Sequence, residues 1–198
     1  MCGIAGIIGG TGDADALVSR MLASLAHRGP DGSGLWSQEA GSRRPVVLGH
    51  RRLAILDLSE AGAQPMLDPA QRLVITFNGE LYNYIELRTQ LIALGARFHS
   101  DTDTEVILAA YEYWGTACLE RFNGMFAFAL YDLQRGVVFC ARDRYGEKPF
   151  LYHHGRGLFA FASEYKALLQ HPGRIRLAWS RLFRLRRPGS VGGHCLPA

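Results

Sequence analysis

The 198-residue sequence lacks any run of eighteen or more apolar residues, so no transmembrane helix is expected. Its first residues, MCGIAG, also lack the basic stretch that opens a secretory signal. These two absences predict a soluble, cytoplasmic protein with no membrane partner. The chain is 48% hydrophobic and 20% charged, a composition that suits one globular domain with a substantial core.

Paired cysteines are also missing. Cys2, Cys118, Cys140 and Cys195 are scattered along the chain, with no CxxC pair and no nearby group of histidines. Their spacing indicates neither a zinc site nor a disulfide framework, and free thiols are expected. Five histidines lack metal-ligand spacing and are expected to be structural: His27, His50, His99, His153 and His154.

Acidic residues are missing from the end of the chain, because none follows Glu164. Six of the 22 Lys and Arg residues follow Gly173, which leaves 16 against 18 Asp and Glu in the body of the chain. The formal charge of +4 therefore belongs to residues 174–198, a basic Arg/Gly-rich tail that is expected to be disordered. The tail has no heptad and no clean amphipathic period, so no nucleic-acid partner is predicted.

Hydrophobic periodicity predicts an antiparallel sheet system with a few helices. Apolar or aromatic runs at 3–8, 73–77, 125–131, 136–141 and 157–162 are typical of strands, whereas spacing of three and four residues predicts helices over 16–25, 84–94 and 104–114. Asp103 is expected to be the N-cap of the last helix, and Gly95 to end the middle one. Strands and helices do not alternate strictly, so the pattern favours an α+β layered domain.

Cys2 has special chemistry if Met1 is removed. Aminopeptidases remove methionine before a small side chain, which would leave Cys2 with both a thiol and a free amine. Free α-amino groups titrate near ~7.7 to 8.0 and cysteine thiols near ~8.5, so the amine can accept the thiol proton at little cost. On this feature alone, a small buried hydrophobic residue near a terminus is the more common interpretation.

Further motifs favour the chemical interpretation of Cys2. The chain resembles the class II glutamine amidotransferases, which are N-terminal nucleophile hydrolases, and most closely the front domain of glutamine-dependent asparagine synthetases. The motifs that carry this resemblance over residues 2–173 are MCGIAG at 1–6, HRGPDGSG at 27–34, GHRRLAILD at 49–57, FNGELYNY at 77–84, SDTDTEVI at 100–107, FNGMFAF at 122–128 and RDRYGEKP at 142–149. The resemblance implies a four-layer αββα sandwich and hydrolysis of L-glutamine through a thioester on Cys2.

The resemblance also implies which residues bind glutamine. Arg52 matches the arginine that grips the α-carboxylate, for which a guanidinium provides two parallel N–H bonds. Arg51 is expected to face solvent, because neighbouring strand residues point to opposite faces. The backbone after Arg52 is expected to line the same site through Leu53, Ala54, Ile55 and Leu56.

Asn78 and Gly79 match the oxyanion hole, the alternative being that Asn-Gly is simply a type I′ hairpin turn. Glu80 and Asp103 match the carboxylates around the substrate ammonium, although Asp103 could instead be purely an N-cap. Asp101 is close to Asp103 in sequence, but Asp103 is the better motif match. Arg28 is expected to brace the catalytic loop, and an ordinary structural salt bridge is as good an interpretation.

In the resembled family, the ammonia passes to a larger domain that adenylates aspartate with ATP and magnesium. No Ser-Gly-Gly-x-Asp-Ser-type pyrophosphate loop occurs here, and nothing after Gly173 continues the family pattern, so a truncated chain is expected. No cofactor is predicted for this chain, the synthetase domain is the partner normally present in cis, and the full-length enzyme is expected to form a homodimer. A non-catalytic product and the glutaminase domain of an enzyme making another amide remain as alternatives.

Overall fold

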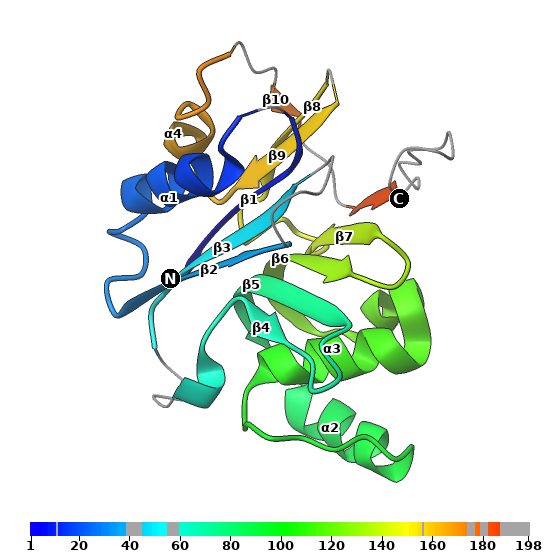
Figure 1. The fold of residues 1–198 in the computed structure, drawn as a ribbon. Coiled ribbons are helices and arrows are strands. Elements are labelled where there is room, and N and C mark those ends of the chain that lie inside the picture. Colours follow the sequence, from blue (N-terminus) through cyan, green and yellow to red (C-terminus); the bar gives the residue numbers. More distant parts are fainter. Residues whose placement is uncertain are drawn as a thin grey trace.

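The computed structural model describes residues 1–10, 12–38, 45–54, 60–155, 157–173, 177–178 and 182–186. These residues form two antiparallel sheets (Figure 1). The first sheet has the order β10 (Leu177–Ala178), β8 (Leu151–Gly155), β9 (Leu158–Ala162), β1 (Gly3–Gly9), β3 (Val46–Arg52) and β2 (Gly32–Ser37). The second has the order β11 (Leu182–Arg186), β7 (Val137–Arg142), β6 (Gly124–Asp132), β5 (Leu73–Leu81) and β4 (Met66–Leu67).

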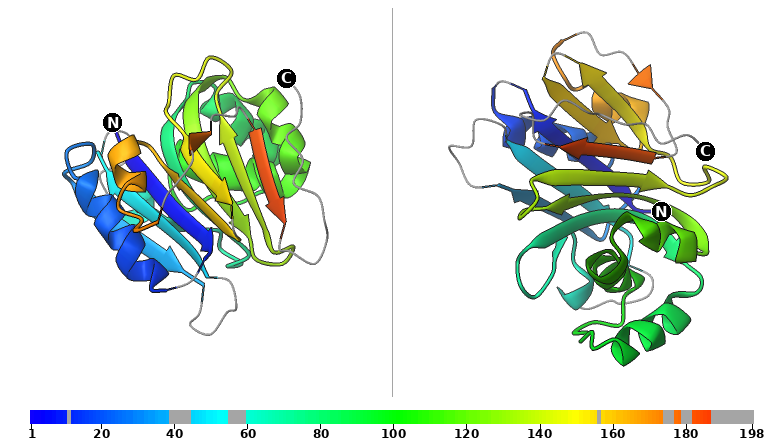
Figure 2. Two further views of the ribbon diagram at one scale, coloured as in Figure 1. Left: turned by 90° about the horizontal axis from the view of Figure 1, so that it is seen from above. Right: turned by 90° about the vertical axis from the view of Figure 1, so that its right-hand side faces the viewer.

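The helices lie on the outer faces of the two sheets (Figure 2). The first sheet packs against α1 (Ala14–Ser24) and the short α4 (Tyr165–Leu168). The second sheet packs against α3 (Asp103–Trp114), which contacts α2 (Tyr84–Ala93), and two 3-10 helices, Glu60–Gly62 and Gly115–Arg121, complete the described elements. A third apolar cluster, which includes Ile4, Leu48, Ala129 and Phe161, fills the space between the sheets. The architecture is the expected four-layer αββα sandwich.

The two-residue period of the strands decides which side chains face the space between the sheets. In β1, Ile4 belongs to the inner cluster whereas Ala5 and Ile7 pack against α1. In β3, Leu48 is inner and Val47 is outer. Continuing this alternation places Cys2 and Arg52 on the inner side at the same end of the sandwich.

The predicted elements are largely confirmed. All three helices occur within two residues of the expected bounds, and the predicted strands occur as β1, β5, β6, β7 and β9. Strands β2, β3 and β8 were not predicted, because GSGLWS, VVLGHRR and LYHHG mix glycine and charged or polar residues with apolar ones. Gly95 does end α2, with φ +103° and its N–H donating to Ile92 O at 2.9 Å.

The N-cap prediction for α3 is wrong. Thr102, not Asp103, caps this helix, with its Oγ1 accepting a hydrogen bond from Glu105 N at 3.3 Å. Thr102 and Glu105 stand at the spacing of a capping box, so Asp103 is the first helical residue and its side chain is available for other contacts.

Two strands lie in the segment that the sequence assigns to the tail. β10 pairs with β8 and β11 pairs with β7, each at the edge of its sheet. The other residues after 173 lie outside the described part of the chain, so the domain boundary at residue 173 and the disorder beyond it stay predictions. No helix among the described residues is long and apolar enough to cross a membrane.

Candidate active site

A pocket lies at the end of the inter-sheet space where β1 begins and β3 ends. Cys2, Arg52, Leu53, Ala54, Asn78, Gly79, Glu80 and Asp103 all line it. Residues from both sheets and from α3, more than 100 positions apart in the sequence, therefore meet at one site. Ile55 and Leu56, which were also predicted to bind glutamine, lie outside the described residues.

The Cys2 thiol lies against the backbone that follows β3. Its Sγ accepts a hydrogen bond from Leu53 N at 3.3 Å and lies 3.6 Å from Leu53 O. The Leu53 segment is itself fixed by Asp31, whose Oδ2 accepts from Ala54 N at 2.9 Å while its backbone N–H donates to Arg52 O at 3.0 Å. The contacts of Asp31 explain why HRGPDGSG and GHRRLAILD act on the same site.

Arg52 and Arg51 point to opposite faces of β3. Arg52 lines the pocket and Arg51 does not. Arg51 is only half-buried, but its Nε is enclosed by protein, so the expected solvent-facing position holds for only part of its side chain. Of the two arginines, Arg52 is therefore the one that lines the pocket.

Asn78 lies inside β5 and does not form a hairpin turn. It pairs with Ala127 of β6 in the middle of a continuous ladder, which rules out the type I′ alternative. The Asn78 side chain is 1% exposed, and its Nδ2 has no hydrogen-bond partner within the described part of the chain. A buried amide donor that lines the pocket is thus left for a ligand oxygen.

The backbone N–H of Gly79 lies on an open edge of β5. Strand β4 pairs only with Val74 and Ile75, so within the described part of the chain the later residues of β5 have no strand on that side. Gln64 Oε1 accepts from Phe77 N at 2.7 Å and Asp103 Oδ2 accepts from Leu81 N at 3.0 Å. Because N–H groups two residues apart point the same way, the Gly79 N–H points to this edge between those two side chains.

A side chain at position 79 has no room. A Cβ there would lie 2.2 Å from the carbonyl oxygen of Met125 and 2.6 Å from the Cα of Phe126. Glycine is therefore required for β5 to approach β6 at the pocket.

Asp103 is held by α3 with its carboxylate in the pocket. Burial raises its pKa to about 6, and the negative Glu80 acts in the same direction, while the hydrogen bond from Leu81 N opposes the rise. Glu80 also lines the pocket. Because the charge of Glu80 disfavours the charged form of Asp103, a cation bound beside these carboxylates is favoured.

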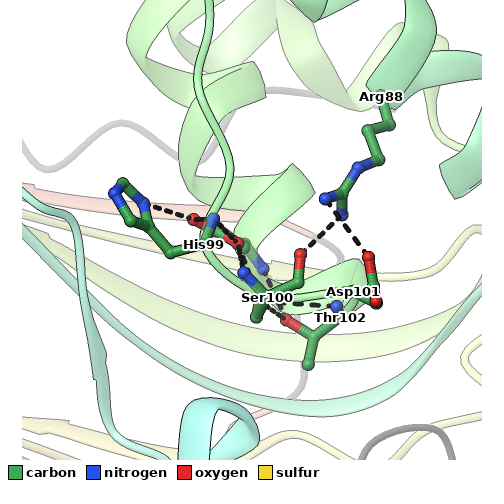
Figure 3. Close-up of polar contacts among 6 residues, drawn as sticks. Arg88, His99, Ser100, Asp101 and Thr102 are labelled. Carbon is green, nitrogen blue, oxygen red and sulfur yellow. Dashed lines mark hydrogen bonds and ion pairs between the residues drawn. The ribbon is translucent and has the colours of Figure 1, made fainter.

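A polar network fixes the start of α3 (Figure 3). Glu105 accepts hydrogen bonds from the backbone N–H groups of His99 and Ser100, at 2.9 and 2.8 Å, and from the Ser100 hydroxyl at 2.7 Å. Arg88 reaches across from α2 to donate to Ser100 O at 2.7 Å and to pair with Asp101 at 3.3 Å. Asp101 points out to solvent, so Asp103 is the aspartate of this motif that faces the pocket.

Arg28 contacts the backbone of Cys2 rather than the pocket. Its Nε donates to Cys2 O at 2.9 Å, and its Nη1 pairs with Glu164 at 2.9 Å. Glu164 also accepts from His27 at 2.9 Å. Arg28 therefore forms the alternative salt bridge and also bonds to the Cys2 backbone, while its role as a brace of the catalytic loop stays a prediction.

The pocket also contains polar residues that were not predicted to bind glutamine, among them His50, Gln64 and Lys148. His50 was predicted to be purely structural. Its Nε2 donates to Phe77 O at 3.1 Å, and burial lowers its pKa to about 4, an effect that the positive Arg52 reinforces and the Phe77 bond opposes. His50 is therefore neutral at pH 7. GHRRLAILD and RDRYGEKP contain His50 and Lys148, so both motifs were signals, but neither shows which side chains turn inward.

Comparisons with known proteins agree with this geometry. A family model described as the glutamine amidotransferase domain matches residues 1–183. A protein named putative asparagine synthetase [glutamine-hydrolyzing] from Mycobacterium bovis is 44% identical over 85% of this chain, and asparagine synthetase [glutamine-hydrolyzing] 3 from Bacillus subtilis is 42% identical over 87%. The chain spans only 28% and 29% of the lengths of these relatives.

The solved structure of glutamine phosphoribosylpyrophosphate amidotransferase from Bacillus subtilis, with ADP and GMP, has a similar fold. The TM-score is 0.72 at 25% identity, over 84% of this chain and 43% of that one. This chain therefore belongs to the glutamine amidotransferase domain family and has the fold of the N-terminal nucleophile hydrolases.

Proposed function

We propose that this chain hydrolyses the side-chain amide of L-glutamine to glutamate and ammonia, with Cys2 as the nucleophile once Met1 is removed. The observation that carries the proposal is the presence of a thiol and hydrogen-bond donors in one pocket. Cys2 lines the same pocket as the buried Nδ2 of Asn78, which has no partner among the described residues, and the edge of β5 that bears the Gly79 N–H. Acyl transfer needs this combination of nucleophile and oxyanion donors.

The proposed reaction runs in two halves. The α-amino group of processed Cys2 accepts the thiol proton, and the thiolate attacks the amide carbon of glutamine. Asn78 and Gly79 donate hydrogen bonds to the oxyanion that forms. When the tetrahedral intermediate collapses, the carbon–nitrogen bond breaks, the nitrogen takes the proton back from the α-ammonium, and ammonia leaves. Water then cleaves the γ-glutamyl thioester, releasing glutamate and restoring the thiol.

Recognition of glutamine follows from the charges around the pocket. We assign Arg52 to the α-carboxylate, because a guanidinium forms two parallel bonds with a carboxylate. We assign Asp103 and Glu80 to the α-ammonium, because both carboxylates line the pocket and disfavour each other's charge until a cation binds. Leu53 and Ala54 complete the wall beside the thiol, and Arg28 keeps the Cys2 backbone in place.

The relatives suggest where the ammonia is used. Both curated relatives are named as glutamine-hydrolysing asparagine synthetases and are more than three times as long as the matched segment. We propose that the inherited purpose is amidation of aspartate, in a synthetase domain that requires ATP and magnesium and in an enzyme that forms a homodimer. No cofactor is assigned to the residues of the glutaminase site.

The proposal is tested by glutamate release from protein whose N-terminus has been shown by mass spectrometry to begin at Cys2. Activity is expected in the processed protein and should be lost both in Cys2→Ala and in a version extended at its N-terminus, since the extension blocks the amine. Cys118→Ala is the matched control. Cys118 is buried away from the pocket, and burial raises its pKa to about 12, so this variant should remain active.

No glutamate release from correctly processed protein would contradict the proposal and favour a non-catalytic role. Release that is insensitive to Arg52→Ala, together with faster hydrolysis of another amide, would indicate a different substrate for the same site.

A further inference from the structure

Lys148 is a buried cation whose side chain contacts Met1, the residue that processing removes. Its side chain is 6% exposed and lines the same pocket as Cys2. The Lys148 Nζ donates to Met1 Sδ at 3.2 Å, and within the described part of the chain no carboxylate forms an ion pair with it. A thioether neutralises no charge, so the positive charge of this ammonium influences nearby ionisable groups.

The position of Lys148 is fixed by the loop that follows β7. The buried carboxylate of Asp143 accepts hydrogen bonds from the backbone N–H groups of Tyr145, Glu147 and Lys148, at 3.1, 2.9 and 3.0 Å. Arg142 Nε donates to Lys148 O at 2.8 Å. With its backbone held on both sides, the lysine has a defined place at the pocket rather than a free surface position.

The contact with Met1 also limits the distance from Lys148 to the amine of Cys2. Five covalent bonds join the Cys2 nitrogen to Met1 Sδ, so these atoms are at most about 6 Å apart, and Lys148 Nζ lies within about 9 Å of the Cys2 nitrogen. Removing Met1 turns that nitrogen into an α-amino group at the same pocket. At this range, two positive charges near a protein surface disfavour each other appreciably.

We propose that Lys148 is a positioning residue for charge, which keeps the α-amino group of processed Cys2 in the unprotonated form that accepts the thiol proton. The inference rests on the proposed function, because it concerns the amine that serves there as the base. A nearby ammonium raises the energy of the protonated amine and so lowers its pKa below the ordinary value of about 7.7 to 8.0.

Of the other charged groups around the amine, some favour its protonated form and some disfavour it. Glu80 from β5 and Asp103 from α3 favour the protonated amine, whereas Arg52 from β3 and Arg28, which donates to Cys2 O, disfavour it. His50 is neutral and contributes little. Bound glutamine brings its own ammonium to the carboxylates and its carboxylate to Arg52, so Lys148 is the cation that remains uncompensated during the reaction.

The test titrates the amine directly. In a Cys2→Ala background, processed protein is treated with cyanate over a range of pH, and carbamylation of the N-terminal amine is followed by mass spectrometry. Lys148→Met should raise the midpoint of this titration by about one pH unit. Lys148→Arg keeps the charge and should leave the midpoint unchanged. Lys148 and Lys166 are the only lysines in the sequence, so Lys166→Met is a matched control and should also have no effect.

The same substitutions are then compared in protein that retains Cys2. Lys148→Met should shift the acidic limb of kcat/KM for glutamine to higher pH by a similar amount, and its folding should be intact because a buried unpaired ammonium is replaced by an apolar chain of similar length. An unshifted amine midpoint, or an equal shift in Lys148→Arg, would overturn the role of Lys148. Absence of glutaminase activity in every processed protein would instead contradict the proposed function.

Discussion

Asn78 lies in β5 with its side chain turned into the space between the sheets. It is 1% exposed, and its Nδ2 has no partner among the described residues. A buried donor without a partner costs about 1–3 kcal/mol, which a ligand oxygen can recover. The free protein therefore keeps Asn78 in an unfavourable state that binding of a developing oxyanion would relieve.

Replacing Asn78 with Ala should lower kcat for glutamine by about 100- to 1000-fold, because one oxyanion donor is typically worth ~2.7 to 4 kcal/mol of barrier. Steady-state glutamate release measures this change. Asn83→Ala is the control, because Asn83 donates to Arg121 O outside the pocket, and its kcat should stay near that of the parent. An equal loss in both variants would indicate a folding defect instead.

Arg52→Ala should raise KM for glutamine at least tenfold and lower kcat much less, since the bond to the α-carboxylate is made equally in the ground and transition states. Arg51→Ala removes the neighbouring guanidinium from the opposite face of β3 and should leave KM nearly unchanged. Steady-state kinetics of the pair distinguish the two arginines. A KM effect confined to Arg51→Ala would show that the wrong one had been assigned.

We expect Asp103 to make glutamine binding depend on pH. Its pKa is raised to about 6, so the carboxylate of the empty pocket is charged above this value and becomes neutral as the pH falls through it. Binding of the substrate ammonium requires the charged form. The Kd for glutamine, measured by calorimetry in Cys2→Ala protein, should therefore rise about tenfold per pH unit well below 6.

Asp103→Asn should bind weakly and lose this pH step, while the exposed Asp101→Asn should keep both the affinity and the step. If Asp101→Asn removed the step, the assignment of Asp103 would be wrong.

Motif matching located Arg52, Asn78 and Asp103 from the sequence, because each stands in a distinctive local pattern. His50 and Lys148 stand in equally distinctive motifs, yet their inward position depends on how β3 and the loop after β7 meet β5. The sequence around each residue does not show how these elements pack against one another. For Asp103, the sequence identified a residue that lines the pocket but predicted the wrong position in α3, the N-cap instead of the first helical residue.

At the scale of elements, the start of α3 connects folding to the site. Thr102 caps the helix, Glu105 accepts from His99 and Ser100, and Asp103 is placed as the first helical residue. The Thr-x-x-Glu spacing was present in the sequence and was the signal that would have placed the N-cap correctly. Aspartate is also a common N-cap, so residue preference alone did not distinguish the two positions.

Thr102→Ala should lower the free energy of unfolding by about 1 kcal/mol, which corresponds to a fall in Tm of about 2–4 °C in a chain of this size. The same variant should weaken glutamine binding, because Asp103 depends on this turn for its position. Thr102→Ser retains the hydroxyl and should restore both properties. Thr89→Ala, on the exposed face of α2, should weaken neither. If Thr102→Ala lowered the stability but left glutamine binding unchanged, the cap would not be needed to position Asp103.

At the scale of the whole molecule, the pocket exists because two sheets pack face to face. The alternation of inner and outer side chains brings Cys2, Arg52 and Asn78 to one end of the inter-sheet space. Strand runs such as 125–131 could be predicted because they are continuous and apolar. β3 could not, because its last residues, Arg51 and Arg52, are charged, and Arg52 lines the pocket rather than the core.

The central claim is that glutamine forms a thioester on Cys2, and the most direct measurement is the mass of the protein quenched in acid during turnover. Processed protein should carry a γ-glutamyl adduct on the N-terminal peptide, bound through the Cys2 sulfur and released by hydroxylamine. Cys118→Ala should carry the same adduct and Cys2→Ala should carry none. Glutamate release without any adduct on Cys2, or an adduct on another residue, would contradict the account.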